Sequence, residues 1–365
     1  MSHFSASGDT DTPQRPRAWA LSSGGKGMEN QCLALAEAAG YAAYPIRLAP
    51  RAPWRWLPEK AWRLWGNVPR RLSPENQKDF ASPWPDLVVA CGRLSVAAAI
   101  HIKRYAGSTT FVVQCQNPRV RPTLFDLVIP PEHDRMAPAD TVFPIIGAPN
   151  LALPWRLQRA GEHWRETFSA LPRPLIAVAI GGSSGAYTLT DDDVDGLFAA
   201  LERMRRQTGG TLAITTSRRT GAHHEARIAA HARRLGAWTA ASVSGGQDAP
   251  SPILGLYALA DILVVTADSV NMAAEAAATG KPVFIAPLAG GSAKFDRFHA
   301  SLRARGITRP LGAEGATIDT WTYAPLAETQ RAADEIRRRM AARGFKLPGF
   351  KLPSGTGGAP PASLF

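Results

Sequence analysis

The sequence has no long hydrophobic run. No segment approaches eighteen consecutive apolar residues, the length that a membrane-spanning helix needs. Residues 1–16 are polar and lack the apolar core of a secretory signal. We therefore expect a cytoplasmic protein whose membrane contact is at most peripheral, on the inner membrane.

Cysteines and acidic residues are also scarce. Cys32, Cys91 and Cys115 are an odd set without CxxC or Cys/His spacing, which disfavours disulfides and a metal site and predicts reduced, buried thiols. The chain has 42 Lys and Arg residues but only 30 Asp and Glu residues, so its formal net charge is +12. This excess favours an acidic partner: nucleic acid, anionic lipid headgroups or a nucleotide-sugar.

The chain is long enough for two domains, and strand-like runs alternate with helical patterns as in α/β proteins. We expect strands at 18–22, 87–90, 110–114, 127–130, 175–180, 211–215, 262–265 and 283–286, and helices at 28–39, 94–105, 192–207, 223–235 and 327–343. A proline-rich stretch at 147–174 is the expected connection. The resulting division is a disordered tail at 1–16, Rossmann-like domains at 17–153 and 154–330, a C-terminal helix at 331–345 and a second tail at 346–365.

The most informative segment is 260–287, which is typical of a strand, a polar turn, a helix and a second strand. A helix that begins at the carboxyl end of a parallel strand offers unpaired N–H groups to an anion. Glu275 lies about two turns along, where its carboxylate could accept from a sugar hydroxyl. The residues expected at the ligand are Thr266, Asp268, Ser269, Asn271, Met272 and Glu275.

Two further strand ends carry polar residues that suit phosphate. The turn at 181–185 combines glycine N–H groups with serine hydroxyls. Ser217 and Arg218 end the next strand along the chain, although two adjacent arginines are often only a solvated pair. Because these ends meet at one sheet edge, we expect a phosphate-bearing ligand at Gly181, Gly182, Ser183, Ser184, Gly185, Ser217 and Arg218.

A third glycine-rich turn, at 24–27, follows the first strand. It matches neither a dinucleotide-binding fingerprint nor a Walker loop, and it is either a ligand-binding turn or a tight turn alone. Arg93 and the Gln116-Asn117 pair end other strands of this domain, where Asn117-Pro118 is equally consistent with a simple turn. The acceptor-side candidates are Gly24, Gly25, Lys26, Gly27, Asn30, Gln31, Arg93, Gln116 and Asn117.

These motifs resemble two related groups of proteins. The turn at 181–185 and the later Ser269, Glu275 and Gly280-Lys-Pro resemble the donor half of GT-B glycosyltransferases, such as the N-acetylglucosaminyltransferase of peptidoglycan assembly. The segments 85–93, 114–119 and 215–219 resemble the bacterial relatives of the plant mitochondrial fission (elongated mitochondria) protein, which have carried the label of nucleoside-diphosphate-sugar epimerases. The resemblance spans roughly 17–330 and implies a GT-B fold, two Rossmann-like domains facing a central cleft.

The GT-B resemblance implies a nucleoside-diphosphate-sugar donor, with a UDP-sugar expected, and no tightly bound cofactor or metal. It places the diphosphate at 181–185 and at Asp268-Ser269, Glu275 on the ribose and Lys294 and Arg297 near the sugar. The first domain departs from the pattern, because Met28 stands where the peptidoglycan enzyme has a proposed catalytic histidine. Glu29 is adjacent and is the candidate base, although a glutamate in a first helical turn is often only a favourable dipole partner.

The segment 51–71 contains four of the ten tryptophans among six basic residues and one acidic residue. Trp54, Trp56, Trp62 and Trp65 with these cations are typical of a helix at an anionic lipid surface, although packing on the sheet would produce the same pattern. No nucleic-acid recognition motif accompanies the charge. Three functions remain: glycosyl transfer to a lipid or envelope acceptor, nucleotide-sugar epimerisation, and a non-catalytic, membrane-associated adaptor.

Overall fold

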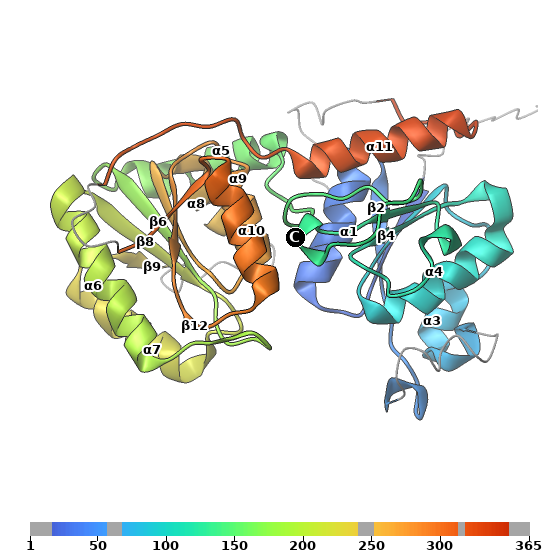
Figure 1. Cartoon of the computed structure of the whole chain (residues 1–365), viewed down its shortest axis with the longest axis horizontal. Helices are drawn as coiled ribbons and strands as arrows, with labels where there is room; N and C mark the ends of the chain where they lie inside the picture. Colours follow the sequence, from blue (N-terminus) through green and yellow to red (C-terminus); the bar gives the residue numbers. More distant parts are fainter. Residues whose placement is uncertain (1–16, 57–67, 240–251, 313–317, 350–365) are drawn as a thin grey trace, which may run out of the picture.

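Two α/β units lie side by side along the long axis of the molecule (Figure 1). The computed structural model describes residues 17–56, 68–239, 252–312 and 318–349. The strands are β1 (Arg17–Ser22), β2 (Ala42–Arg47), β3 (Leu87–Cys91), β4 (Phe111–Cys115), β5 (Leu127–Ile129), β6 (Leu175–Ile180), β7 (Tyr187–Thr188), β8 (Thr211–Thr216), β9 (Trp238–Thr239), β10 (Ile262–Thr266), β11 (Val283–Ala286), β12 (Ala289–Gly290) and β13 (Thr308–Pro310).

The helices cover the sheets and connect their strands. They are α1 (Lys26–Ala38), α3 (Pro74–Asp79), α4 (Arg93–Ala106), α5 (Pro154–Ser169), α6 (Asp191–Thr208), α7 (Gly221–Arg234), α8 (Pro252–Leu259), α9 (Val270–Ala277), α10 (Ala293–Ala304) and α11 (Glu328–Ala342). Short 3₁₀ turns include η1 (Trp54–Trp56), η2 (Pro69–Arg71) and η5 (Glu132–Asp134).

The first domain has five parallel strands in the order β2-β1-β3-β4-β5. Both faces of this sheet are covered, because successive strand residues alternate between two apolar clusters. Leu87 and Val89 pack with α1 and α11 residues, whereas Val88 and Ala90 pack with residues of α4 on the other face. The chain order reverses direction between β1 and β3, so the first domain has its switch point there.

The second domain has six parallel strands in the order β13-β11-β10-β6-β8-β9. Its first strand in the chain, β6, lies in the middle, and the strand order reverses between β6 and β10. A crevice at the carboxyl ends of two such strands is where open α/β sheets bind ligands. A small antiparallel pair, β7 with β12, adjoins this edge.

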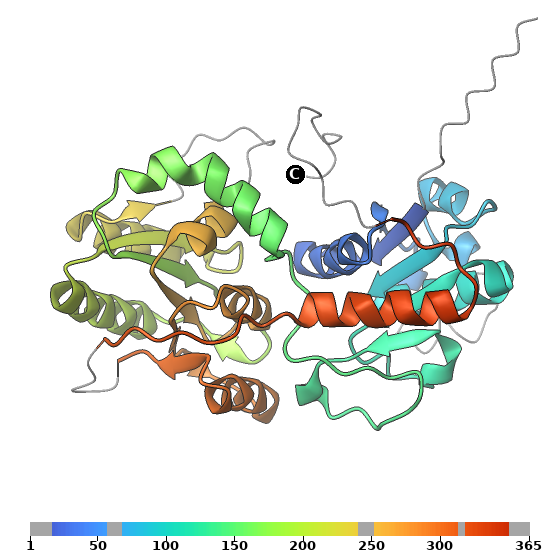
Figure 2. The same cartoon turned by 90° about the horizontal axis from the view of Figure 1, so that it is seen from above.

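One helix lies inside the expected connection, and the last helix lies at its predicted place in the chain. The predicted connection at 147–174 contains α5, which packs against α8 and has Trp164 and Phe168 in the second core. The last helix, α11, returns to the first domain and lies along it in both views (Figures 1 and 2). Ala333, Ile336 and Met340 of α11 are buried against α1 and the sheet, so the C-terminal helix belongs to the first core.

The two parallel sheets confirm the predicted α/β class with Rossmann-like domains. The expected strands and helices are present, but the sequence did not predict the strands β2, β7, β9, β12 and β13 or the helices α3, α5, α8 and α10. β2 contains Pro45 and exposed Tyr44, which is typical of an edge strand and lacks the apolar run of a buried one. The three cysteines are free and buried, as expected. Within the described ranges, no helix is long and apolar enough to cross a membrane.

Candidate functional site

The switch point of the second domain is built from the ends of β6 and β10. The amide of Gly181 donates to Thr266 Oγ1 (2.8 Å) and the amide of Gly182 donates to Asp268 Oδ2 (3.1 Å). Thr266 Oγ1 in turn donates to Asp268 Oδ1 (2.6 Å). Two of the amides that we expected to bind a phosphate therefore already donate to Thr266, the last residue of β10, and to Asp268 in the turn that follows.

Glycine is required at both positions for close packing. A Cβ atom at Gly181 would lie 2.2 Å from both carboxylate oxygens of Asp268, and one at Gly182 would lie 2.1 Å from the carbonyl oxygen of Arg219. Within the described part of the chain, the amides of Ser183 and Gly185 have no hydrogen-bond partner, and no atom lies within 4 Å of a Cβ added at Gly185. The open end of this turn is thus 183–185.

Ser183 and Ser184 hold the rest of the turn in place. The Ser183 hydroxyl accepts from the amide of Leu189 (3.0 Å), and the Ser184 hydroxyl accepts from the amide of Tyr187 (3.2 Å). The amide of Ser184 donates to the carbonyl of Tyr187 (2.8 Å). Both serine hydroxyl oxygens therefore already accept hydrogen bonds from backbone amides of the same loop.

The arginine that reaches the site is Arg219, whereas the sequence pattern favoured Arg218. Arg219 Nη2 lies 2.7 Å from Asp268 Oδ2, and Nη1 donates to the carbonyl of Gly182 (3.4 Å). Arg218 is exposed. Ser217 belongs to the turn, since its amide donates to the carbonyl of Ile180 (2.9 Å) and its hydroxyl accepts from the amide of Arg219 (3.2 Å).

The next helix, α9, begins at Ser269, whose hydroxyl accepts from the amide of Met272 (3.3 Å). Glu275 follows on the same helix, half-buried, and has no hydrogen-bond or ion-pair partner among the described residues. Burial raises the pKa of Glu275 to about 7. A desolvated carboxyl without a partner gains by accepting hydrogen bonds from a bound hydroxylated ligand.

Gln31 joins the two domains at their switch points. Its Nε2 donates to Asn271 Oδ1 (3.1 Å), while its Oε1 accepts from Cys91 Sγ (3.3 Å) and Gln116 Nε2 (3.2 Å). A Cβ atom at Gly27 would lie 3.0 Å from Asn271 Nδ2. The start of α1 therefore faces the start of α9, and the two strand-end regions predicted from the sequence lie against each other.

Lys294 and Arg297, expected near the sugar, make their contacts across the domain boundary. Lys294 Nζ lies 2.6 Å from Asp134 Oδ1, and Arg297 donates to the carbonyl of His133 (2.9 Å). Burial, followed by the charge of Lys294, lowers the pKa of His133 to about 4. His133 and Arg297 also line a pocket of about 150 Å³ between the domains.

The glycine turn of the first domain is more open. Gly24 is exposed with φ of 85°, and no atom lies within 4 Å of an added Cβ. The Met28 side chain lies over Gly25 and Gly92: an added Cβ would meet Met28 Cε at 2.8 Å and Met28 Sδ at 2.5 Å, respectively. Lys26 is exposed. An apolar side chain therefore occupies this switch point.

Glu29 is held by Arg47. The guanidinium donates to Oε2 (2.6 Å) and Oε1 (2.9 Å), and these hydrogen bonds lower the pKa of the Glu29 carboxyl despite its burial. Both acceptor oxygens are occupied, so the geometry disfavours Glu29 as a general base.

Of the other acceptor-side candidates, Gln116 and Asn117 lie in the turn after β4, whereas Arg93 and Asn30 lie on helices. Asn117 Oδ1 accepts from the amide of Arg119 (2.8 Å). This hydrogen bond is typical of a simple turn at Asn117-Pro118, the alternative to a ligand-binding role for Asn117. Gln116 has φ of 67° and contacts Gln31. Arg93 begins α4 and is exposed, and Asn30 is half-buried on α1.

Only part of the tryptophan segment is described. Trp54 packs on the first core with the Arg71 guanidinium 4.2 Å from its ring centroid, and Trp56 is 68% exposed. Trp62 and Trp65 lie outside the described residues. One of the two described tryptophans thus packs on the sheet and the other faces solvent.

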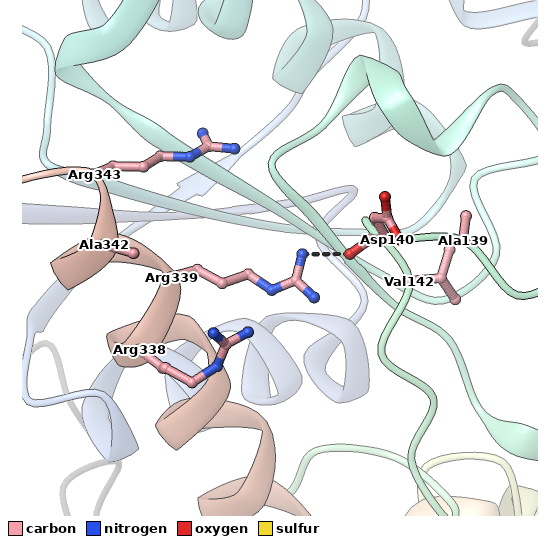
Figure 3. Close-up of a pocket in the computed structure, with 7 residues that line it drawn as sticks. All are labelled: Ala139, Asp140, Val142, Arg338, Arg339, Ala342 and Arg343. Carbon is pink, nitrogen blue, oxygen red and sulfur yellow. Dashed lines mark hydrogen bonds between the residues drawn. The ribbon is translucent and has the colours of Figure 1, made fainter.

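A pocket of about 510 Å³ lies beneath the end of α11 rather than at either switch point. Figure 3 shows Arg338, Arg339 and Arg343 beside the segment of Asp140, with Arg339 donating to the Asp140 carbonyl (2.6 Å). Glu335 pairs with Arg338 and Arg339, and the buried Asp126 pairs with Arg343. These two acids therefore offset only part of the positive charge, because Asp126 also pairs with Lys103.

Comparison with known proteins identifies the family. The family model described as mitochondrial fission ELM1 matches residues 26–340. The mitochondrial fission protein ELM1 of Arabidopsis thaliana is 35% identical over 301 residues, covering 74% of this chain and 67% of the relative. An uncharacterized protein of Rickettsia prowazekii is 24% identical over 293 residues, covering 69% and 79%.

Solved structures similar to this chain include a UDP-GlcNAc 2-epimerase from Methanocaldococcus jannaschii, with a TM-score of 0.49, 10% identity and coverage of 83% of this chain and 88% of that one. The calicheamicin glycosyltransferase CalG4 has a TM-score of 0.45, 12% identity and coverage of 91% and 95%. The sequence matches carry the assignment: the chain belongs to the mitochondrial fission ELM1 family.

Proposed function

We propose that the second domain binds a nucleotide-sugar at the switch point between β6 and β10. The observation that carries this proposal is the convergence of an open glycine-serine turn, an arginine, a helix start and the carboxyl of Glu275, which has no partner among the described residues, at one sheet edge. Such an edge is where parallel α/β sheets hold nucleotides, and each group matches one part of a nucleotide-sugar.

The diphosphate would lie against the open end of the turn. The amides of Ser183 and Gly185 and the first amides of α9 are the available donors. Asp268 is buried and negative, but Arg219 offsets its charge while keeping 41% of its own side chain exposed. The exposed Arg218 adds a second cation beside the turn.

Glu275 would accept from hydroxyls of the nucleoside. Because its pKa is raised to about 7, its charged form is only partly populated near neutral pH. A hydroxyl donor favours the charged carboxylate, so binding should strengthen as the pH rises through 7.

Transfer of the sugar to an acceptor held by the first domain is the reaction that this arrangement would serve. The facing starts of α1 and α9, linked by Gln31 and Asn271, support an acceptor beside the donor. A lipid or envelope acceptor is consistent with the exposed Trp56 and the basic segment around it. Flotation with anionic liposomes at low salt tests the lipid surface, and absence of binding would contradict it.

The binding test is a thermal-shift panel of UDP-, GDP-, CMP- and ADP-sugars. A ligand at one hundred times its Kd adds about 2.7 kcal/mol to the free energy of unfolding, so a specific donor should raise Tm by several degrees. Glu275→Gln should weaken that shift, whereas Glu202→Gln, at a half-buried position in the second half of α6, should retain it. If no nucleotide-sugar raises Tm at millimolar concentration, the donor site is not there.

A second candidate is an adaptor that binds the nucleotide-sugar without turnover. Two observations favour it: Met28 fills the first switch point, and both Glu29 oxygens are held by Arg47. Incubation of the protein with the best-binding nucleotide-sugar, followed by chromatography for free nucleotide and for epimerised sugar, separates the alternatives. Binding with neither product supports the adaptor, epimerised sugar without an added acceptor supports an epimerase, and acceptor-dependent nucleotide release supports transfer.

A further inference from the structure

Two histidines and one aspartate meet on the outer side of the second domain. Asp191 is the first residue of α6, and His223 and His224 lie in the first turn of α7. Their ligand atoms, one from each residue, all lie within 4.8 Å of one another. Because 32 residues separate the aspartate from the first histidine, only the packing of α6 against α7 brings them together.

The distances match a metal coordination sphere. His223 Nε2 and His224 Nε2 lie 2.9 Å and 3.5 Å from Asp191 Oδ1. In a tetrahedral zinc site with bonds of about 2.0 to 2.1 Å, neighbouring ligand atoms are about 3.3 to 3.4 Å apart. An ion could thus take all three ligands with small side-chain rotations.

The hydrogen bonding of His224 identifies its free nitrogen. Nδ1 lies 3.3 Å from the carbonyl oxygen of Thr220, which can only accept, so Nδ1 carries a proton. In a neutral ring the lone pair is then on Nε2, directed toward the Asp191 carboxylate. Two acceptors that face each other need a proton or a metal cation between them, and a backbone carbonyl that orients the second ring nitrogen is a usual feature of metal-bound histidine.

The charges around the cluster leave one carboxylate oxygen available. Asp191 Oδ2 is 3.5 Å from Arg227 Nη1, while Oδ1 faces the two histidines. Arg227 is itself paired with both oxygens of Asp195, so its charge is largely offset. Asp192 and Asp193 adjoin Asp191 in the first turn of α6, and the local field favours a cation.

We propose that Asp191, His223 and His224 form a binding site for a divalent transition metal such as Zn²⁺, with water completing the coordination. The two imidazole donors suit Zn²⁺, Cu²⁺ and Ni²⁺, whereas Mg²⁺ and Ca²⁺ prefer sites made of oxygen ligands alone. The aspartate follows the loop that contains Ser183, and the histidines follow the loop of Arg219. A bound ion would therefore fasten together the two loops of the β6 edge, whether or not a nucleotide-sugar binds there.

The test is metal binding to the full, tag-free chain. Isothermal titration with Zn²⁺ should show one site, and Co²⁺ should produce the visible absorption of a tetrahedral complex. The double variant His223→Ala/His224→Ala and the single variant Asp191→Asn should each weaken binding by about 10- to 100-fold or more. His163→Ala, an exposed histidine on α5, is the matched control and should bind like the wild type.

Melting temperatures measured without metal show whether each variant is folded. Equal Zn²⁺ affinity in the wild type and the double variant would overturn the proposal and would point to the buried cysteines as ligands. Absence of Zn²⁺ binding to the wild type at micromolar protein would also overturn it. A wild-type Tm that rises with Zn²⁺, and fails to rise in the folded double variant, supports it.

Discussion

The two switch points of this molecule have similar sequence patterns and different structures. At the second, Gly181 and Gly182 are packed against Asp268 and Arg219, and their amides donate to the side chains of Thr266 and Asp268 at the end of β10. At the first, Gly24 is exposed and Met28 fills the space beside Gly25. A glycine-rich turn after a strand therefore indicates that the backbone can adopt unusual conformations or pack closely. The side chains around the turn decide whether the glycines are tightly packed or exposed.

The largest expected effect tests the tight packing of the second turn. Gly182→Ala places a Cβ 2.1 Å from a backbone oxygen that cannot rotate away, and should cost about 3 kcal/mol or more, lowering Tm by roughly 10 °C. Gly185→Ala meets no atom within 4 Å and should change stability by less than about 1 kcal/mol. Equal Tm values for the two variants would show that the turn is looser than described.

The pH dependence of stability tests the raised pKa of Glu275 near the same sheet edge of the second domain. Its folded pKa of about 7 exceeds the ordinary value of 4.5, so the folded protein binds this proton more tightly and loses stability as the pH rises from about 4.5 to 7. Glu275→Gln removes that loss and should stabilise the ligand-free protein by up to about 3 kcal/mol at alkaline pH, with little effect near pH 5. Denaturant unfolding at both pH values measures the difference, and a pH-independent effect would contradict the raised pKa.

Substitutions at Asp268 and Arg219 test the ion pair that links the loop after β10 to the loop after β8. Asp268→Ala leaves the buried amide of Gly182 without its acceptor and should cost about 2 kcal/mol. Arg219→Ala should cost less, because 41% of the arginine side chain is exposed. A double-mutant cycle by denaturant unfolding should show a coupling of about 1 kcal/mol, and purely additive effects would mean that the pair is not formed in solution.

The smallest effect is expected in the first domain. The partner of Glu29, Arg47, is 67% exposed, so Glu29→Gln should cost less than about 1 kcal/mol at neutral pH. Since the pKa of Glu29 is lowered, this contribution is present above the ordinary pKa and is lost as the pH falls through the folded value. Unchanged turnover of any nucleotide-sugar by this variant would remove Glu29 from the mechanism, and loss of turnover with unchanged Tm would restore it as a candidate.

Several features were predictable because they depend on local sequence. The buried strands at 175–180 and 262–265 are β-branched and apolar, and Ser269 caps the next helix as its residue type suggests. The edge strand β2 was missed because it has no continuous apolar run. The sequence pattern favoured Arg218, whereas Arg219 is the arginine that contacts Asp268, because spacing along a turn does not reveal which side chain faces the sheet edge.

The sequence by itself determined the two-domain α/β architecture, the burial of the cysteines and the edge of the sheet at which polar residues gather. Each of these follows from hydrophobic periodicity, residue type and the rule that parallel strands end at one edge. The tertiary structure alone decided that Asp268 occupies the Gly182 amide, that Lys294 and Arg297 bridge the domains and that two histidines meet an aspartate between α6 and α7. These contacts join residues far apart in the chain, and no local preference specifies which distant side chain will be the neighbour.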